Sequence, residues 1–462
     1  MWINEGSARY SEMVFLEGLY GQTAYKKEVY DNHYDVLKNH YIIDSGYYAI
    51  ANVPQNFTYG ETTYNKGADV LYNLRGYLGD SLFFLGLKGV LDSAKWSNLS
   101  SLDFQNYMGN TIGVDLSDFF NGWVFQPGFP DFDIDSYSVS GSGGNYVLDI
   151  NIIQQLRGLN IYHQNVPLIL TLVDDNDVEH EFNIQVSGAL TPISLNINFV
   201  PKTYFLNKNR VINYATTVVD TLLNGNSMSL LQTNMFTVKT YSTSSQVRVR
   251  VENHWTGAYG NHPSHIILSK DRYWNIEGDM TTADPIRFNL FFNGKYNNFN
   301  YDTGLRDFIG STFVEDSLVV LYRATPNDNW QVYSEAVYNS LGDNTDAYCR
   351  FEVENVSASG QFTFGYKLYN AGVTENGWVD SKIIIFPNPV KDELSILNLN
   401  SNNFKIYKYI IYDEKGQIVK KGDFEPSHNS SIKVSDLKSG VYIIKLNNQT
   451  QGVEFNQKFV KE

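Results

Sequence analysis

The sequence predicts an α+β multidomain protein, in which a helical block at residues 1–130 is followed by three all-β, sandwich-like domains. Apolar residues recur at helical spacing in the first block, and polar and apolar residues alternate from residue 131 onward. The chain has 462 residues, enough for roughly three domains. Hydrophobic residues make up 42 % and charged residues 18 %, a composition that supports packed cores rather than disorder.

In the helical block, apolar side chains recur every three or four residues. Such spacing places them on one face of a helix. Thr62 or Thr63 is the predicted N-cap of a helix over 64–78, Gly79 is its predicted end, and Asp80 could cap the next helix. The residues that carry the pattern are Met13, Leu16, Leu19 and Tyr20 in the first run and Ala68, Leu71, Leu74 and Leu78 in the second.

Alternating segments divide the rest of the chain into three predicted domains. Strands are expected at 146–152 and 168–173, and the acidic run from Asp174 to Asp177 is typical of a turn after the second strand. We therefore expect a small β-sandwich at 131–222, a β-rich domain of unknown role at 226–375 and a compact all-β unit at 383–462.

Charge and cysteine content exclude several classes of protein. The formal net charge is −15, and an acidic surface repels phosphate backbones, so nucleic acid is not expected as a partner. No run approaches the ~18 apolar residues of a membrane span, and the first residues lack the basic and apolar regions of a signal peptide. A single cysteine, Cys349, excludes an intramolecular disulfide and is expected to be buried and inert.

Two short motifs carry the functional signal. Trp2-Ile3-Asn4-Glu5-Gly6 is followed, 59 residues after its glutamate, by Tyr64-Asn65-Lys66-Gly67-Ala68. They resemble the W-[LI]-N-E-G-x-A and Y-x-K-G-A segments of peptidase family M1, the aminopeptidase N-like gluzincins, and Leu78-Gly79-Asp80 with Phe83-Phe84 extends the match. The resemblance implies that 1–130 is the α-helical half of a thermolysin-like catalytic domain. It also implies that Glu5 is a zinc ligand and that Tyr64 donates a hydrogen bond to the tetrahedral oxyanion.

The chain departs from that family in one respect: it contains no H-E-x-x-H. That motif supplies two zinc ligands and the general base, and a catalytic zinc needs three protein ligands. His33 and His40 are seven residues apart, ~10 Å along a helix, too far to share one ion. His262 and His265 have metal-like spacing but flank Pro263 in a β-rich loop. We therefore expect Zn²⁺ only in a complete enzyme, with the missing motif upstream of Met1 and this fragment inactive alone.

The last domain carries a second resemblance. Phe386-Pro387-Asn388-Pro389 opens it, Gly440-Val441-Tyr442 follows, and the tail Lys458-Phe459-Val460-Lys461 is basic. This order resembles the C-terminal sorting domain of type IX secretion substrates, with Phe386 where that domain has tyrosine. The resemblance implies a Bacteroidetes-type bacterium, the type IX machinery as a partner, and a secreted or surface-attached product.

Two functions remain open at this stage. The first is a zinc metallopeptidase of aminopeptidase type that hydrolyses peptide bonds in peptide or protein substrates. The alternative is a non-catalytic surface binding protein on a peptidase scaffold, which the missing zinc motif favours. Two smaller ambiguities accompany them: Asp131, Asp133 and Asp135 could bind calcium or be solvated turn residues, and the aromatic residues of 254–275 could stack on sugars or pack inside a sandwich.

Overall fold

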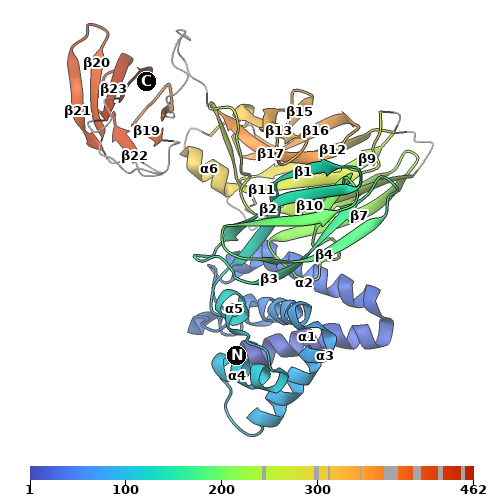
Figure 1. Ribbon diagram of the computed structural model, residues 1–462. Coiled ribbons are helices and arrows are strands. Elements are labelled where there is room, and N and C mark those ends of the chain that lie inside the picture. Colours follow the sequence, from blue (N-terminus) through green and yellow to red (C-terminus); the bar gives the residue numbers. More distant parts are fainter. Residues whose placement is uncertain are drawn as a thin grey trace.

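The computed structural model has helices at one end and antiparallel sheets stacked beyond them, which is the predicted α+β arrangement (Figure 1). In Figure 1 the helices are blue and the sheets run from green to red. The described residues are 1–241, 246–282, 284–295, 301–310, 313–343, 345–368, 383–398, 407–424, 430–448 and 453–462.

The helical block contains four long or medium helices with short turns between them. Gly79, with φ of 71°, breaks the third helix at the position predicted as its end, since a positive φ suits glycine. Ser100 caps the fourth helix in a capping box with Asp103. The elements are α1 (Trp2–Tyr20), α2 (Gln22–Ile43), the 3₁₀ turn η1 (Gln55–Phe57), the π-helix η2 (Thr62–Lys66), α3 (Gly67–Ala94), α4 (Ser101–Ile112), α5 (Ser117–Phe119) and the π-helix η3 (Phe120–Val124).

Two three-stranded sheets follow the helices. One has the order β1-β2-β5 and the other β4-β3-β6. The turn predicted at Asp174 is confirmed: its carboxylate accepts hydrogen bonds from the backbone N–H groups of Asn176 and Val178, at 2.8 and 3.0 Å. The strands are β1 (Phe129–Ser142), β2 (Asn145–Arg157), β3 (Val166–Val173), β4 (Glu179–Val186), β5 (Leu190–Ile197) and β6 (Thr203–Leu206).

A larger pair of sheets comes next. The six-stranded sheet has the order β14-β13-β17-β11-β10-β7, and the five-stranded sheet the order β15-β16-β12-β9-β8. The elements are β7 (Thr216–Asn224), β8 (Met228–Leu231), η4 (Gln232–Asn234), β9 (Phe236–Thr240), β10 (Gln246–His254), β11 (Ile266–Gly278), β12 (Ile286–Asn293), α6 (Thr303–Ile309), η6 (Glu315–Ser317), β13 (Leu318–Arg323), β14 (Gln331–Val332), β15 (Ala336–Ser340), β16 (Tyr348–Val356) and β17 (Gly360–Lys367).

The pairing of β7 corrects one predicted boundary. The sequence placed residues up to 222 in the small sandwich, but β7 pairs along its whole length with β10 of the larger one. The physical reason is that its hydrogen-bonding partner lies 30 residues ahead in the chain, between Asn224 and Gln246 at the near end and Thr216 and His254 at the far end. The remaining division into domains stays a prediction, and residues 369–375 of the predicted 226–375 domain lie outside the described residues.

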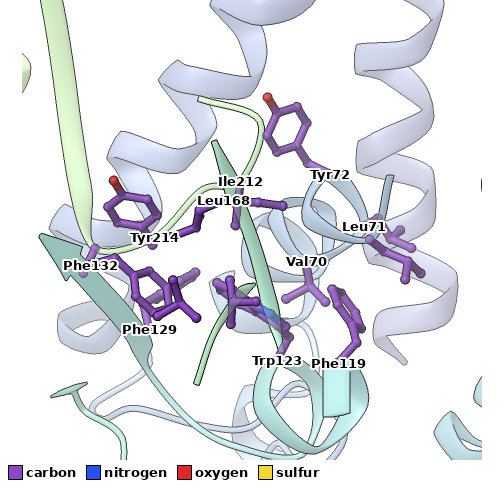
Figure 2. Packing of buried hydrophobic residues seen from close by; sticks show 14 of the residues in the cluster. Val70, Leu71, Tyr72, Phe119, Trp123, Phe129, Phe132, Leu168, Ile212 and Tyr214 are labelled. Atoms are coloured by element: carbon purple, nitrogen blue, oxygen red, sulfur yellow. The ribbon is translucent and has the colours of Figure 1, made fainter. Parts of the chain in front are cut away.

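One apolar core joins the helices to the first two sheets (Figure 2). Val70 of α3, Trp123 of η3, Phe129 of β1 and Leu168 of β3 all belong to it. The larger sandwich has its own core, which includes the fully buried Trp274 and Cys349. Burial raises the pKa of the Cys349 thiol well above its usual value, so the residue is inert as predicted.

A buried polar cluster links the small sandwich to the large one. His254 of β10 lies 3.0 Å from the Asp131 carboxylate of β1, and its ring stacks on Tyr273 at a centroid distance of 4.4 Å. The Tyr273 hydroxyl donates to Asp133 at 2.8 Å. Asp131 and Asp133 are therefore buried hydrogen-bond acceptors, neither solvated turn residues nor calcium ligands. The aromatic residues of this stretch are interior as well: Trp255 and Trp274 are buried, so packing, not sugar stacking, explains them.

The protonation of His254 should make stability depend on pH. Burial alone would lower its pKa, but the charges of Asp131 and Asp133 and the hydrogen bond raise it to about 9. Because the folded pKa exceeds the unfolded value of 6.5, this stabilisation is complete below pH 6.5 and is lost as pH rises through 9. We expect the free energy of unfolding to fall by on the order of 1–3 kcal/mol between pH 7 and 10. Denaturant unfolding checks this, and the same loss in His254→Gln would contradict it.

The C-terminal unit consists of two further sheets, in the orders β18-β19-β22 and β21-β20-β23-β24. Asn388 of the Pro-Asn-Pro opening ties down the last strand: its amide donates to the Lys458 carbonyl at 3.0 Å and accepts from the Val460 N–H at 2.7 Å. Within the described ranges, no helix has the length and apolar character needed to cross a membrane. The strands are β18 (Ile383–Phe386), β19 (Glu393–Asn398), β20 (Tyr407–Asp413), β21 (Ile418–Phe424), β22 (Ser430–Lys433), β23 (Gly440–Asn448) and β24 (Val453–Lys461).

Candidate functional site

The structure brings Glu5 and Tyr64, the two residues singled out by the motifs, to the same place. Glu5 lies in the first turn of α1, and Tyr64 is the middle residue of the π-helix η2. Both side chains are only partly covered, and a side-chain hydrogen bond between them contributes to the titration of Tyr64. A π-helical turn is rare and frequently marks a functional position. The 59 residues that separate the motifs in sequence are thus folded back to place a carboxylate beside a phenol.

Two glycines make this approach possible. Gly6 follows Glu5, Gly67 lies three residues after Tyr64, and the two backbones touch where α1 crosses the junction of η2 and α3. A Cβ atom added at Gly6 would lie 2.9 Å from the Gly67 Cα, and one added at Gly67 would lie 3.0 Å from the Gly6 Cα. Neither neighbour is a side chain that could rotate away. The glycine of each motif is therefore needed for the contact that sets the separation of Glu5 and Tyr64.

Buried polar groups hold η2 in position. The Asp44 carboxylate accepts hydrogen bonds from the N–H groups of Glu61 and Thr62, at 3.1 and 2.7 Å, and from the Thr62 hydroxyl at 2.6 Å. At the other end, the buried Lys66 ammonium donates to the Tyr48 carbonyl at 3.0 Å. The predicted cap by the Thr62 or Thr63 side chain is wrong, because a carboxylate from the end of α2 satisfies these N–H groups instead.

The start of α1 is fixed from a third direction. Trp2 is 2 % exposed, and its indole N–H donates to the Ser101 hydroxyl of α4 at 2.9 Å. Its ring also packs on Phe104 at a centroid distance of 5.5 Å. With the tryptophan clamped against α4 and Gly6 against Gly67, the first turn of α1 has little freedom to rotate. The side chain of Glu5 is thereby held on the Tyr64 side.

The environment of Tyr64 keeps its phenol protonated. Its pKa is raised above 10, first by desolvation and then by the hydrogen bond to Glu5 and the negative charge of that carboxylate. A neutral phenol can donate a hydrogen bond at neutral pH, whereas a phenolate could only accept one. The pair therefore consists of an acceptor carboxylate and a neutral donor, held side by side at the surface of the helical block.

These residues do not by themselves form a zinc site. In the part of the chain that the structure describes, no group of three or more His, Cys, Asp or Glu side chains could hold a metal ion. His33 is buried between Asp69 and the Tyr214 carbonyl, each 2.7 Å from a ring nitrogen. Burial lowers the pKa values of His40 and His163 to about 3, so both stay neutral inside the core. His262 and His265 join no such group, and His428 lies outside the described residues.

Replacing Gly67 by alanine should separate the two functional side chains. The added methyl meets the Gly6 backbone at 3.0 Å, so α1 has to move away from η2. We expect the free energy of unfolding to fall by about 1–3 kcal/mol, the usual cost of overpacking. The pKa of Tyr64 should also move back toward 10, because the Glu5 carboxylate recedes. Tyrosine titration by NMR checks this. Gly18→Ala, with nothing within 4 Å of the added methyl, is the control, and an unchanged Tyr64 pKa in Gly67→Ala would contradict the expectation.

Comparison with known proteins accounts for both motifs. Residues 1–123 match the domain described as Peptidase family M1 domain. The helical block is an M1 peptidase segment. At the other end of the chain, residues 384–462 match the Secretion system C-terminal sorting domain, which implies secretion or surface attachment. The two resemblances seen in the sequence are therefore confirmed, and the M1 match contains both Glu5 and Tyr64.

Individual relatives of the M1 segment are aminopeptidases at low identity. A probable aminopeptidase 1 of Saccharolobus solfataricus is 24 % identical over 207 residues, covering 43 % of this chain and 26 % of that protein. Aminopeptidase N of Lactococcus lactis is 36 % identical over 67 residues, which is 14 % of this chain and 8 % of that protein. The chain thus spans about a quarter or less of these relatives. A crystal structure of Legionella pneumophila aminopeptidase A in complex with aspartic acid aligns at 17 % identity over 46 % of this chain and 24 % of that one. Its TM-score of 0.35 is too low to support a shared fold.

Proposed function

We propose that this chain supplies part of the active site of a zinc-dependent, aminopeptidase-type metallopeptidase that hydrolyses peptide bonds. In this proposal Glu5 is a metal ligand and Tyr64 is a hydrogen-bond donor to the reacting carbonyl. The observation that carries it is the placement of Glu5 beside Tyr64, from two motifs 59 residues apart. Residues 1–130 would then be the α-helical half of a thermolysin-like catalytic domain.

Tyr64 has the properties that the proposed role requires. Attack on a peptide carbonyl places negative charge on its oxygen, and a preorganised donor stabilises that charge in the transition state. The raised pKa keeps the phenol proton available, and partial exposure of Tyr64 lets a substrate reach it. The rigid crossing at Gly6 and Gly67 holds the donor in place before substrate arrives.

Glu5 alone cannot hold a catalytic metal. A bound zinc would polarise the carbonyl and lower the pKa of a water molecule, and such a site needs three protein ligands with one position left open. The proposal therefore requires two further ligands and a general base in addition to the residues of this chain. Glu5, as a partly exposed carboxylate on a fixed helix turn, suits the role of one ligand among three.

The sorting domain suggests where such a peptidase would act. We propose export by the type IX secretion machinery of a Bacteroidetes-type bacterium, with the enzyme secreted or held at the cell surface. The proposal is supported by the sorting-domain match at 384–462. Its substrates would then be peptides or proteins outside the cell.

Zinc content separates the proposed functions most simply. In the protein purified from the cells that make it, Glu5→Gln should remove bound zinc and abolish hydrolysis of leucine p-nitroanilide, because an amide is a poor zinc ligand. Glu12→Gln on the same helix is the matched control, since Glu12 is exposed and paired only with Arg9. A natural protein with neither zinc nor peptidase activity would overturn the peptidase proposal and favour the surface binding protein.

A further inference from the structure

A cavity unconnected with Glu5 and Tyr64 lies where the helices meet the large sandwich. It has a volume of about 210 Å³ and is bounded by α2, the segment 206–214, the start of β7 and Glu252 of β10. The segment 206–214 is rigidly attached on the inner side: the Asn213 N–H donates to Asn73 at 2.7 Å, and the Asn207 amide donates to the Ile212 carbonyl at 2.7 Å. The walls are therefore formed before any ligand binds.

Positive charge gathers at this cavity without a matching carboxylate. Arg210 lines it, stacks on the Tyr30 ring at 3.3 Å and donates to the Val218 carbonyl at 3.1 Å. Lys26 stands beside it, and its ammonium donates to the Tyr72 hydroxyl. Among the described residues, neither Arg210 nor Lys26 forms a salt bridge. Desolvation and mutual repulsion lower the pKa values of both, that of Lys26 to about 8. An anion bound between them would relieve this repulsion.

The acidic residues of the cavity do not neutralise Arg210. Glu252 is paired with Arg250, at 2.7 Å, and Asp31 is paired with Lys27 on the exposed side of α2. Each of these carboxylates therefore already has a cation of its own. The charge that remains at the cavity is the guanidinium of Arg210.

A buried hydroxyl also faces the cavity without a partner. Tyr214 lines the cavity and is 6 % exposed. Within the described part of the chain, its hydroxyl forms no hydrogen bond, while its carbonyl is taken by His33. Figure 2 shows the phenol oxygens of Tyr72 and Tyr214 directed away from Phe129 and the apolar core. A buried hydroxyl without a partner is unfavourable, and a ligand oxygen at this point would satisfy it.

We propose that this cavity binds a small organic carboxylate with an apolar body about the size of one aromatic ring. Arg210 would hold the carboxylate, with the Tyr214 hydroxyl as a second donor and Tyr34 and Val219 against the apolar part. The volume supports this size, because a cavity of about 150 Å³ is known to accept benzene. The bound carboxylate would bridge α2 and β7, and so it would join the helical block to the large sandwich.

The test is a titration of the full chain with 4-fluorobenzoate, observed by ¹⁹F NMR, with the neutral 4-fluorobenzamide as the matched probe. Binding of the carboxylate but not of the amide is expected. Arg210→Gln should weaken binding at least about tenfold, since a charge-assisted hydrogen bond is lost. Tyr214→Phe should weaken it about three- to tenfold. Arg248→Gln, which removes an exposed arginine already paired with Asp220, should leave it unchanged.

Three results would overturn the proposal. These are no binding of the carboxylate at saturating concentration, equal binding of carboxylate and amide, or unchanged affinity in Arg210→Gln. If Arg210→Gln fails to fold, the comparison of the two probes and the Tyr214→Phe variant still decide. A ligand that bridges the two units should also raise the melting temperature in proportion to its occupancy, which provides an independent readout.

Discussion

Replacing Tyr64 by phenylalanine is expected to lower kcat for leucine p-nitroanilide about 100- to 1000-fold in the zinc-loaded natural protein. Losing one preorganised oxyanion donor has an effect of that size in other hydrolases. The ring and its packing stay in place, so only the donor is lost. KM and bound zinc should change little, because the phenol acts on charge that develops in the transition state and is no metal ligand in this proposal.

Tyr59 provides the matched control for that experiment. It lies five residues before Tyr64 and is 72 % exposed, and its charge is felt by Tyr64. Tyr59→Phe should therefore leave kcat within about twofold of the wild type, since exposed substitutions away from the site rarely matter. Full activity of Tyr64→Phe, or an equal loss in both variants, would rule out the donor role.

Asp302→Ala should destabilise the large sandwich by about 3–5 kcal/mol, the cost of leaving a buried charge without its partner. Asp302 and Arg272 are both fully buried and form a two-pronged ion pair, with N–O distances of 2.7 and 2.6 Å. The same carboxylate accepts the Asn293 N–H at 2.7 Å. Its removal therefore leaves a guanidinium and a backbone donor uncompensated at once.

Denaturant unfolding of the full chain measures this effect, with Asp92→Ala as the control. Asp92 pairs with Lys88 on α3, and both side chains are about 70 % exposed, so that replacement should cost less than about 1 kcal/mol. The double variant Arg272→Met, Asp302→Leu should be more stable than Asp302→Ala, because it removes both charges. Equal stability of Asp302→Ala and Asp92→Ala would show that the ion pair contributes little.

The candidate site was predictable from short motifs, but its support was not. Glu5 and Tyr64 each stand in a recognisable segment, and their roles stay predictions. The contact between Gly6 and Gly67 could not be foreseen, because nothing in a linear sequence says which two glycines will touch. Asp44 was missed for the same reason: it satisfies N–H groups 17 and 18 residues further on, after the chain has turned back from α2.

Element types were easier to predict than pairings and burial. Alternation indicated the strands, and Gly79 indicated the break in α3, since both are local properties. The pairing of β7 with β10, and the burial of Asp131 against His254 at a separation of 123 residues, depend on tertiary structure. An acidic strand residue looks solvated in sequence until its distant histidine is known.

The most direct test of the peptidase proposal is to locate zinc by anomalous X-ray diffraction in crystals of the protein as its cells produce it. The proposal predicts one zinc ion bonded to a Glu5 carboxylate oxygen, on the side of α1 that faces Tyr64. Zinc bound elsewhere, with Glu5 still bonded only to Tyr64, would contradict it.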